Sequence, residues 1–262
     1  RPLQELTPEG LIALMVGREL SDLFPPRTGE TGPILLSCRN LTLASGSEPI
    51  SFDLHAGEIV GLAGLEGQGQ GEMARALVGQ CFALAGEVVV GGQAMKVPMG
   101  QQAGIRVMQR LRVGFVPEDR KEEGLLLGAS IHENVVIARQ AARAAFRPAT
   151  RFRELTRKIM SDLNVRAQSP DMAVGALSGG NQQKVLLGRY LASDMDVLIV
   201  EEPTRGVDIG AKAEIYRLLR ALAEQGKAIL VLSRETVELI GLCDRLLVVH
   251  DRKIVREMRG AD

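Results

Sequence analysis

The chain has 262 residues, 45% of them hydrophobic, which suffices for one large α/β domain or two small ones with a sizeable core. Its 32 basic and 32 acidic residues cancel and are interspersed, so the sequence lacks the basic surface that binds nucleic acid or anionic membranes. With no tryptophan and 3% aromatic residues, a base-stacking platform is also disfavoured, and we expect no nucleic acid as a partner.

The cysteines and the apolar runs indicate the redox compartment of the protein and its relation to membranes. The three cysteines are far apart, odd in number and without CxxC spacing, which indicates reduced core thiols in a cytosolic protein. They are Cys38, Cys81 and Cys243. No apolar run approaches the roughly 18 residues of a membrane span, so we expect any association with a membrane to be peripheral.

Residues 1–33 are predicted to form a tail helix and a linker ahead of the main domain. Thr7 suits an N-cap and Pro8 the first helical position. The stretch from Phe24 to Pro33 is rich in proline and glycine, which is typical of an extended linker. Because such a helix has no core of its own, we expect it to end a preceding domain.

From residue 34 onward, short apolar runs alternate with helical spacing, which predicts an α/β domain over 34–255 and a C-terminal tail over 256–262. The early runs alternate and suit an antiparallel edge sheet, whereas those from Glu58, Val197 and Ala228 are continuous, as in buried parallel strands. The expected strands are Ile34 to Leu43, Glu58 to Ala63, Gly86 to Val90, Val113 to Val116, Val197 to Val200, Ala228 to Leu232 and Leu246 to Val249. The expected helices are Met73 to Val78, Ile131 to Ala138, Phe152 to Leu163, Asn181 to Leu191, Ala213 to Ala223 and Thr236 to Leu242.

A glycine-rich loop after the strand ending at Ala63 keeps the frame of a phosphate-binding loop. The frame G-x-x-x-x-G fits from Gly64 to Gly69, with a further glycine at Gly67. A strand, a glycine turn and a helix start direct backbone N–H groups and the helix dipole toward an anion. An ordinary glycine turn, unrelated to nucleotide binding, is the alternative interpretation of this loop alone.

The three residues after this frame lack the groups that hold a nucleotide. Gln70 replaces the lysine that meets the terminal phosphates, and losing one partner of a desolvated charge pair costs on the order of 2 to 5 kcal/mol. Gly71 replaces the hydroxyl that binds Mg²⁺, and Glu72 adds an anion that repels a polyphosphate. The loop therefore predicts weak phosphate binding.

Leu177 to Lys184, here called the signature segment, reads Leu-Ser-Gly-Gly-Asn-Gln-Gln-Lys. Ser178 is predicted to be an N-cap, and Gly179 and Gly180 leave the first helical amides open to a γ-phosphate. A capped helix start explains Ser-Gly-Gly but not the whole string, which favours a binding function.

Two adjacent acids, Glu201 and Glu202, follow the apolar strand from Val197 to Val200. The carboxyl ends of strands are where α/β sheets place ligands, and where a Walker B acid meets Mg²⁺ while the next carboxylate orients water. Glu201 is one methylene longer than the usual aspartate, which would displace the metal or its bridging water. Solvated acids at a strand end are the alternative; we favour function because two adjacent charges need a partner.

These motifs resemble the ATP-binding-cassette (ABC) ATPases, and more narrowly the C-terminal cassette of tandem ATPases of ribose-, galactose- or xylose-type sugar importers. The resemblance covers nearly the whole chain and is strongest in three strings, Val116 to Leu125, Leu177 to Lys184 and Glu202 to Asp208. It implies the ABC ATPase fold, with a mixed parallel P-loop core sheet, an antiparallel edge sheet and a helical signature subdomain over approximately 120–190.

The resemblance also implies roles for single residues. Glu202 matches the catalytic glutamate, and Glu201 the acid that binds the metal. Glu118 stands where cassettes usually have the Q-loop glutamine, Asp208 matches the D-loop aspartate at the dimer interface, and Arg234 replaces the switch histidine.

Gln182, in the signature segment, is also expected among the nucleotide contacts, whereas no histidine occupies the switch position and no aromatic residue near Leu41 to Ser45 is available to stack on adenine. We expect all three histidines at the surface or in turns, namely His55, His132 and His250.

The implied cofactors are ATP and Mg²⁺, bound weakly or not at all at this chain's own loop. Cassette dimers hold each ATP between the P-loop of one cassette and the signature of the other. The resemblance therefore implies a degenerate cassette of a carbohydrate importer, which supplies the signature to its partner's ATP site and couples hydrolysis to sugar uptake.

The implied partners are an upstream N-terminal cassette, transmembrane permease subunits and, indirectly, a periplasmic sugar-binding protein. The implied location is peripheral, at the cytoplasmic face of the inner or plasma membrane. Two alternatives stay open. One is a self-sufficient Mg-ATPase with Glu202 as base and Gln70 as a tolerated neutral substitute; the other is a nucleotide-independent scaffold that docks a membrane subunit through the region after Glu118.

Overall fold

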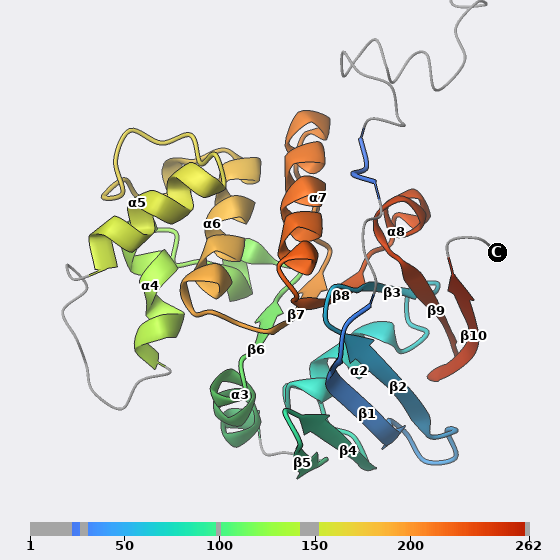
Figure 1. Ribbon diagram of the computed structural model, residues 1–262. Coiled ribbons are helices and arrows are strands. Elements are labelled where there is room, and N and C mark those ends of the chain that lie inside the picture. The colour runs from blue at the N-terminus through green and yellow to red at the C-terminus, as the bar shows by residue number, and fades with distance from the viewer. Residues whose placement is uncertain (1–22, 27–30, 98–100, 142–151, 260–262) are drawn as a thin grey trace, which may run out of the picture.

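The computed structural model describes residues 23–26, 31–97, 101–141 and 152–259 (Figure 1). The tail helix expected before residue 23 and part of the expected linker lie outside these residues. Within them the chain forms two sheets with helices packed around them, in an α/β arrangement. Among the described residues, no helix combines the length and the apolar character that crossing a lipid bilayer requires.

The larger sheet has the strand order β10-β9-β3-β8-β7-β6. Its parallel strands are β3 (Ile59–Ala63), β6 (Val113–Val116), β7 (Val197–Glu201), β8 (Ala228–Leu232) and β9 (Arg245–His250), and β10 (Lys253–Arg259) pairs with β9 in the antiparallel sense. All residues of β7 and β8 are buried, as their continuous apolar sequences predict. The carboxyl ends of β3, β7 and β8 therefore lie close together.

The smaller sheet is antiparallel, with the strand order β2-β1-β4-β5. Its strands are β1 (Ile34–Thr42), β2 (Ile50–His55), β4 (Ala85–Val90) and β5 (Gln93–Lys96). It packs with α2 (Gln70–Leu77) and α3 (Gln101–Arg110) around one hydrophobic core, to which Val197 and Ile199 of β7 also belong. The antiparallel edge sheet expected from the alternating early runs is confirmed.

A second core lies on the other face of the larger sheet. Leu198 and Val200 of β7 point into it, so successive residues of this strand contribute to opposite cores, as the period of two in a strand requires. The helices around this core are α4 (Ile131–Ala141), α5 (Arg153–Asp162), α6 (Gly179–Ala192), α7 (Ile209–Glu224) and α8 (Thr236–Leu242). In Figure 1, α4, α5 and α6 gather at one end of the molecule and the antiparallel sheet at the other.

Two short helical elements also occur, the π-helix η3 (Arg120–Gly124) and the 3-10 helix η5 (Val174–Ala176).

The structure also corrects several expectations. Elements β2, β5, α3 and β10 are absent from the predicted set, and β10 includes residues 256–259, which were expected to form a tail. His132 was expected at the surface or in a turn, but it lies in α4 with 4% of its surface exposed, because its ring Nδ1 shares a hydrogen bond with the Thr156 hydroxyl at 2.7 Å.

The three cysteines are not equally buried. Cys38 and Cys243 are in the core, and burial raises the pKa of the Cys38 thiol to about 12. Cys81 is only partly buried, which corrects the expectation of three core thiols. In the native protein a thiol reagent such as Ellman's is therefore expected to modify one fast-reacting cysteine. Cys81→Ser should remove that fast phase, and a fast phase that persists in this variant would refute the assignment.

Candidate functional site

The glycine-rich loop, residues 64–71, follows the end of β3 and includes the first two residues of α2, which begins at Gln70. Gly67 and Gly69 have φ angles of 82° and 106°, in the left-handed region that favours glycine. A Cβ at Gly69 would also lie 2.7 Å from the Cγ of Arg252, in the turn between β9 and β10. Glycine is thus required at this position by the chain's own packing.

The side chain of Gln70 turns back onto the loop. Its Nε2 donates hydrogen bonds to the carbonyl oxygens of Gly64 at 3.0 Å and Leu65 at 2.8 Å. Its Oε1 is buried without a hydrogen-bond partner among the described residues. The amide therefore stabilises the loop from inside, and it supplies no positive charge where a P-loop lysine would.

The turn between β9 and β10 covers the outer side of the glycine-rich loop. The backbone N–H of Asp251 donates to Oε1 of Gln68 at 2.9 Å, and the N–H of Arg252 donates to the Gln68 carbonyl at 2.8 Å. The Arg252 guanidinium also donates to both carboxylate oxygens of Glu72, at 2.8 and 3.0 Å. These contacts fix the loop by protein groups alone and satisfy the anion of Glu72.

A cavity of about 230 Å³, here called the loop pocket, lies between this loop and the carboxyl ends of β7 and β8. Five carboxylates and one guanidinium line it among the described residues, an unfavourable balance for a polyphosphate. The pocket brings together nine of the predicted site residues, Gly67, Gly69, Gln70, Gly71, Glu72, Glu118, Glu201, Glu202 and Arg234. Gly64 lines an adjoining groove between the loop and α8.

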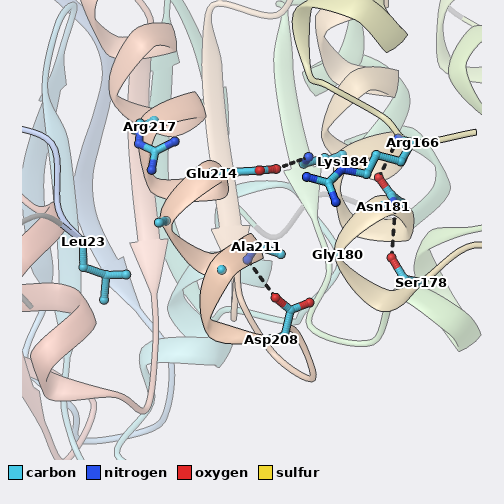
Figure 2. A pocket seen from close by; sticks show the side chains of 12 residues that line it. Leu23, Arg166, Ser178, Gly180, Asn181, Lys184, Asp208, Ala211, Glu214 and Arg217 are labelled. Atoms are coloured by element: carbon cyan, nitrogen blue, oxygen red, sulfur yellow. Dashed lines mark hydrogen bonds and ion pairs between the residues drawn. The ribbon is translucent and has the colours of Figure 1, made fainter. Parts of the chain in front are cut away.

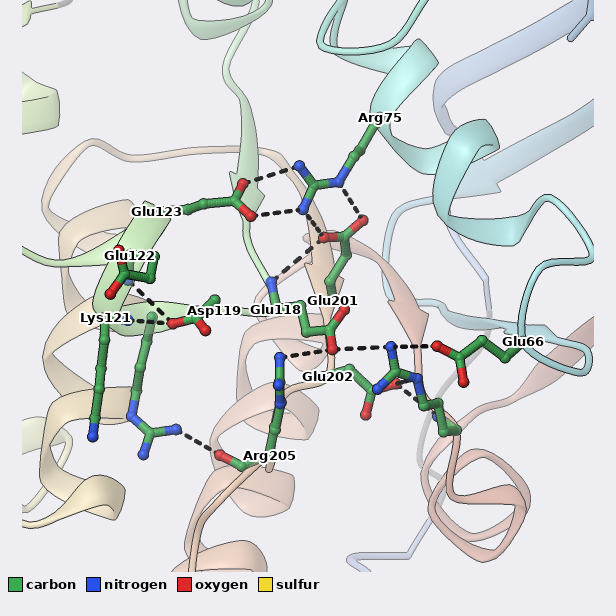
Figure 3. Close-up of polar contacts among 12 residues, drawn as sticks. Glu66, Arg75, Glu118, Asp119, Lys121, Glu122, Glu123, Glu201, Glu202 and Arg205 are labelled. Carbon is green, nitrogen blue, oxygen red and sulfur yellow. Dashed lines mark hydrogen bonds and ion pairs between the residues drawn. The ribbon is translucent and has the colours of Figure 1, made fainter.

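Glu201, the predicted metal ligand, is buried and paired with Arg75 of α2 (Figure 3). Arg75 donates to its two oxygens at 3.2 and 2.7 Å and to those of Glu123 at 2.9 and 3.3 Å. Burial raises the pKa of Glu201, although Arg75 acts to lower it. Burial acts to lower the pKa of Arg75, but its hydrogen bonds to Glu123 and Glu201 outweigh this and raise the pKa. The guanidinium supplies the positive charge that this carboxylate would otherwise take from a cation.

Arg234 lies among the other acids of the loop pocket. Its Nη2 is 3.0 Å from Oε1 of Glu118 and 3.3 Å from Oε1 of Glu66, and its backbone N–H donates to Oε1 of Glu202 at 2.8 Å. Arg205 donates to the same Glu118 oxygen at 2.7 Å (Figure 3). Burial raises the pKa of Glu202 above its usual value. Both predicted acids, Glu201 and Glu202, thus have an arginine partner from this chain.

Magnesium and ATP fit this pocket poorly on the residues present. Gly71 offers no hydroxyl, the Gln70 amide is engaged by the loop, and the carboxylate of Glu201 already has a counter-charge. Among the residues described, the pocket therefore lacks the lysine cation and the hydroxyl that a catalytic step on a nucleotide would use. The contacts of its residues with a nucleotide stay a prediction.

The signature segment lies apart from the loop pocket, at the start of α6. Ser178, Gly180 and Asp208 line a second cavity of about 280 Å³, here called the signature pocket, between α6 and α7 (Figure 2). Ser178 occupies the predicted N-cap position, but it makes no side-chain cap bond; its Oγ is instead 3.0 Å from Nδ2 of Asn181. Asp208 caps α7 by accepting from the N–H of Ala211 at 3.0 Å. Two exposed polar groups therefore flank an open helix start.

The two signature glycines are also required by packing within the chain. A Cβ at Gly179 would lie 2.7 Å from the carbonyl oxygen of Gly206, and one at Gly180 would lie 2.6 Å from the Cβ of Ala211. Gln182 is buried and donates to carbonyl oxygens of residues 174 and 177 at 3.4 and 3.2 Å, so its bonds go into the protein. Gly179 and Gln182 do not line either pocket.

The sequence predicted no role at these sites for four arginines, namely Arg75, Arg120, Arg205 and Arg252. Two of them, Arg120 and Arg205, lie in strings that carry the resemblance, Val116 to Leu125 and Glu202 to Asp208. The number of acids predicted at this site was a signal for them, because five carboxylates in one pocket need positive side chains beside them.

The sequence matches the ABC transporter family over residues 47–205. It is 40% identical over 268 residues to a ribose import ATP-binding protein of Rhizobium johnstonii, covering 100% of this chain and 51% of that protein. It is 42% identical over 255 residues to a ribose import ATP-binding protein of Rhizobium meliloti, covering 95% of this chain and 49% of that protein. The chain spans about half the length of these relatives.

Solved structures with the same fold include the ATP-binding cassette MJ0796, a dimer in a post-hydrolysis state bound to ADP and Pi, with a TM-score of 0.73 and 19% identity over 86% of this chain and 99% of that one. A nucleotide-free cassette from an ABC transporter gives 0.72 at 19% identity, over 87% of this chain and 92% of that one. They show the fold, with its mixed core sheet and antiparallel edge sheet. Since the family match covers more than half of the chain, this protein belongs to the ABC transporter family as an ATP-binding cassette.

Proposed function

We propose that this chain is the degenerate cassette of a carbohydrate importer. Its signature segment completes the ATP site of an upstream cassette, and its own loop pocket binds nucleotide weakly or hydrolyses it slowly. The observation that carries this proposal is the ion pair between Arg75 and Glu201, because an internal cation occupies the carboxylate that would bind Mg²⁺. The sugar-import relatives, at about 40% identity, support the transport role.

The signature pocket and the loop pocket differ in the groups that they would offer to a phosphate. In the partner's site, ATP supplies the γ-phosphate. Ser178 would donate a hydroxyl proton to that phosphate, and the first amides of α6 and its helix dipole would stabilise the negative charge. The loop pocket offers instead carboxylates that already have arginine partners. Coupling to sugar uptake would follow through permease subunits at the cytoplasmic face of the membrane.

Binding of ATP to this chain alone tests the degenerate pocket. Losing the lysine partner of a phosphate costs on the order of 2 to 5 kcal/mol, or roughly 30-fold to several thousand-fold in affinity. We therefore expect no saturable binding of labelled Mg-ATP below about 1 mM in equilibrium dialysis. Gln70→Lys should tighten binding, because it returns a cation to the loop.

Gln93→Lys is the matched control, since it adds the same charge on the exposed strand β5, and Gln93 does not line the loop pocket. Tight binding by the unaltered chain would contradict the proposal and favour the self-sufficient ATPase. Equal tightening by both lysine variants would show that general charge, and not the loop, is responsible.

A further inference from the structure

One arginine joins three segments that surround the signature segment. Arg120 is the first residue of η3, and its Nη1 and Nη2 donate to the carbonyl oxygens of Arg205 and Gly206 at 2.5 and 3.3 Å. Its Nε donates to Oε1 of Gln182, in the first turn of α6, at 3.3 Å. The guanidinium therefore joins η3, to which Arg120 belongs, to α6 and to the turn over residues 202–208, which connects β7 to α7.

The fit around this guanidinium is close. A Cβ at Gly179 would lie 2.8 Å from Nη2 of Arg120, so the side chain packs directly against the first residue of α6. Burial lowers the pKa of Arg120, and its guanidinium donates to carbonyl and amide oxygens. A planar group with several fixed donors satisfies three acceptors at once, which a lysine ammonium on its flexible stem does less well.

The orientation of Arg120 is set from both ends of η3. At its start, Oδ1 of Asp119 accepts from the N–H groups of Lys121 and Glu122 at 2.9 and 3.1 Å. At its end, Arg189 of α6 donates to the carbonyl oxygen of Gly124. The short helix is thus held on α6 independently of Arg120, which lets the guanidinium act on the adjoining turn.

The same turn is tied to the loop pocket on its other side. The side chain of Arg205 pairs with Glu118 (Figure 3), and Glu118 also forms an ion pair with Arg234. The carbonyl of Arg205 thus belongs to the Arg120 contacts and its guanidinium to the loop pocket. The turn that carries Asp208 is held between the two faces of the cassette.

We propose that Arg120 is a positioning residue that fixes the start of α6, and with it Ser178 and Gly179, against the 202–208 turn. This inference rests on the proposed function, because it concerns the ATP site that the signature segment would complete in a partner cassette. Arg120 does not itself line the signature pocket. It acts through the side-chain amide of Gln182 and the carbonyl oxygens of Arg205 and Gly206.

The test compares Arg120→Ala and Arg120→Lys in the complete ATPase. In the proposed site, nucleotide would bind the partner's P-loop first, and the signature segment would meet the γ-phosphate when the site closes. We therefore expect kcat to fall about 10-fold in Arg120→Ala and about 3-fold in Arg120→Lys, with KM for ATP changed less than about 2-fold. Lys121→Ala is the matched control, because Lys121 is the exposed next residue.

The measurements are steady-state ATP hydrolysis, per folded molecule, and thermal unfolding of each variant. A kcat equal to that of Lys121→Ala would overturn the inference, and so would a loss that is confined to KM. Partial recovery in Arg120→Lys separates positioning from simple loss of folded protein. Ser178→Arg distinguishes the two proposals: if it abolishes activity while Arg120→Ala is normal, only this inference fails, and if it leaves activity unchanged, the proposed function fails.

Discussion

Replacing Ser178 by arginine is expected to lower the ATPase activity of the complete protein about 100-fold. Ser178 is exposed at the start of α6 and lines the signature pocket. An arginine there would fill the space in front of the first amides and remove the hydroxyl donor. Removing one preorganised donor from a reacting centre costs about 10² to 10³ in kcat, which sets the size of the effect.

The fold should tolerate this change. Ser178 makes no side-chain cap bond, so its loss removes little of the usual capping energy of about 1 kcal/mol. Ser161→Arg is the matched control, because Ser161 is exposed on α5 and outside both pockets. ATPase activity in Ser178→Arg within about 2-fold of Ser161→Arg would show that the signature segment serves no ATP site.

Replacing Arg75 by methionine is expected to lower the free energy of unfolding by about 3 kcal/mol at pH 7. Methionine keeps the unbranched stem but leaves Glu201, whose side chain is 6% exposed, without its counter-charge. Removing one member of a buried pair is costlier than removing both, because the remaining charge stays desolvated. Urea unfolding followed by circular dichroism measures the difference.

The double variant Arg75→Met/Glu201→Gln should recover most of this loss, since a neutral amide needs no counter-charge. The deficit of the single variant should also depend on pH. Burial already raises the pKa of Glu201, and loss of Arg75 raises it further, so the folded state favours the protonated acid. Stability is then regained as the pH falls from 7 toward the unfolded pKa near about 4.3. A deficit that is equal in both variants and constant with pH would assign the loss to Glu123 or to the Phe115 ring, 5.3 Å from the guanidinium carbon.

The central strands could be predicted because all of their consecutive residues are buried and therefore apolar. Both faces of β7 are covered by hydrophobic cores, so Val197 to Val200 are all apolar. Strand β10 is different. Within the described part of the chain it pairs only with β9, and three successive residues, Val255 to Glu257, are exposed, so its sequence has no apolar run. Edge strands of this kind are defined by their partner's backbone, which a local pattern does not reveal.

The candidate site was predictable only in part, for a similar reason. The carboxyl ends of β3 and β7 meet at one edge of the sheet, and this brings the glycine-rich loop to Glu201 and Glu202 as expected. Arg75 is separated from Glu201 by 126 positions, and nothing near it in the sequence marks its partner. Ion pairs between distant segments depend on the packing of α2 on the sheet, which spacing along the chain does not encode.

The turn between β9 and β10 gives the glycine-rich loop a structural reason to keep Gly69. Gly69 must lack a side chain because Arg252 lies against it, whether or not a phosphate ever enters the loop. A chain with this hairpin would keep the glycines after it had ceased to bind ATP. Sequence patterns built on those glycines would therefore classify such loops as nucleotide-binding sites. The two residues after Gly69 are the better criterion for a loop that binds nucleotide.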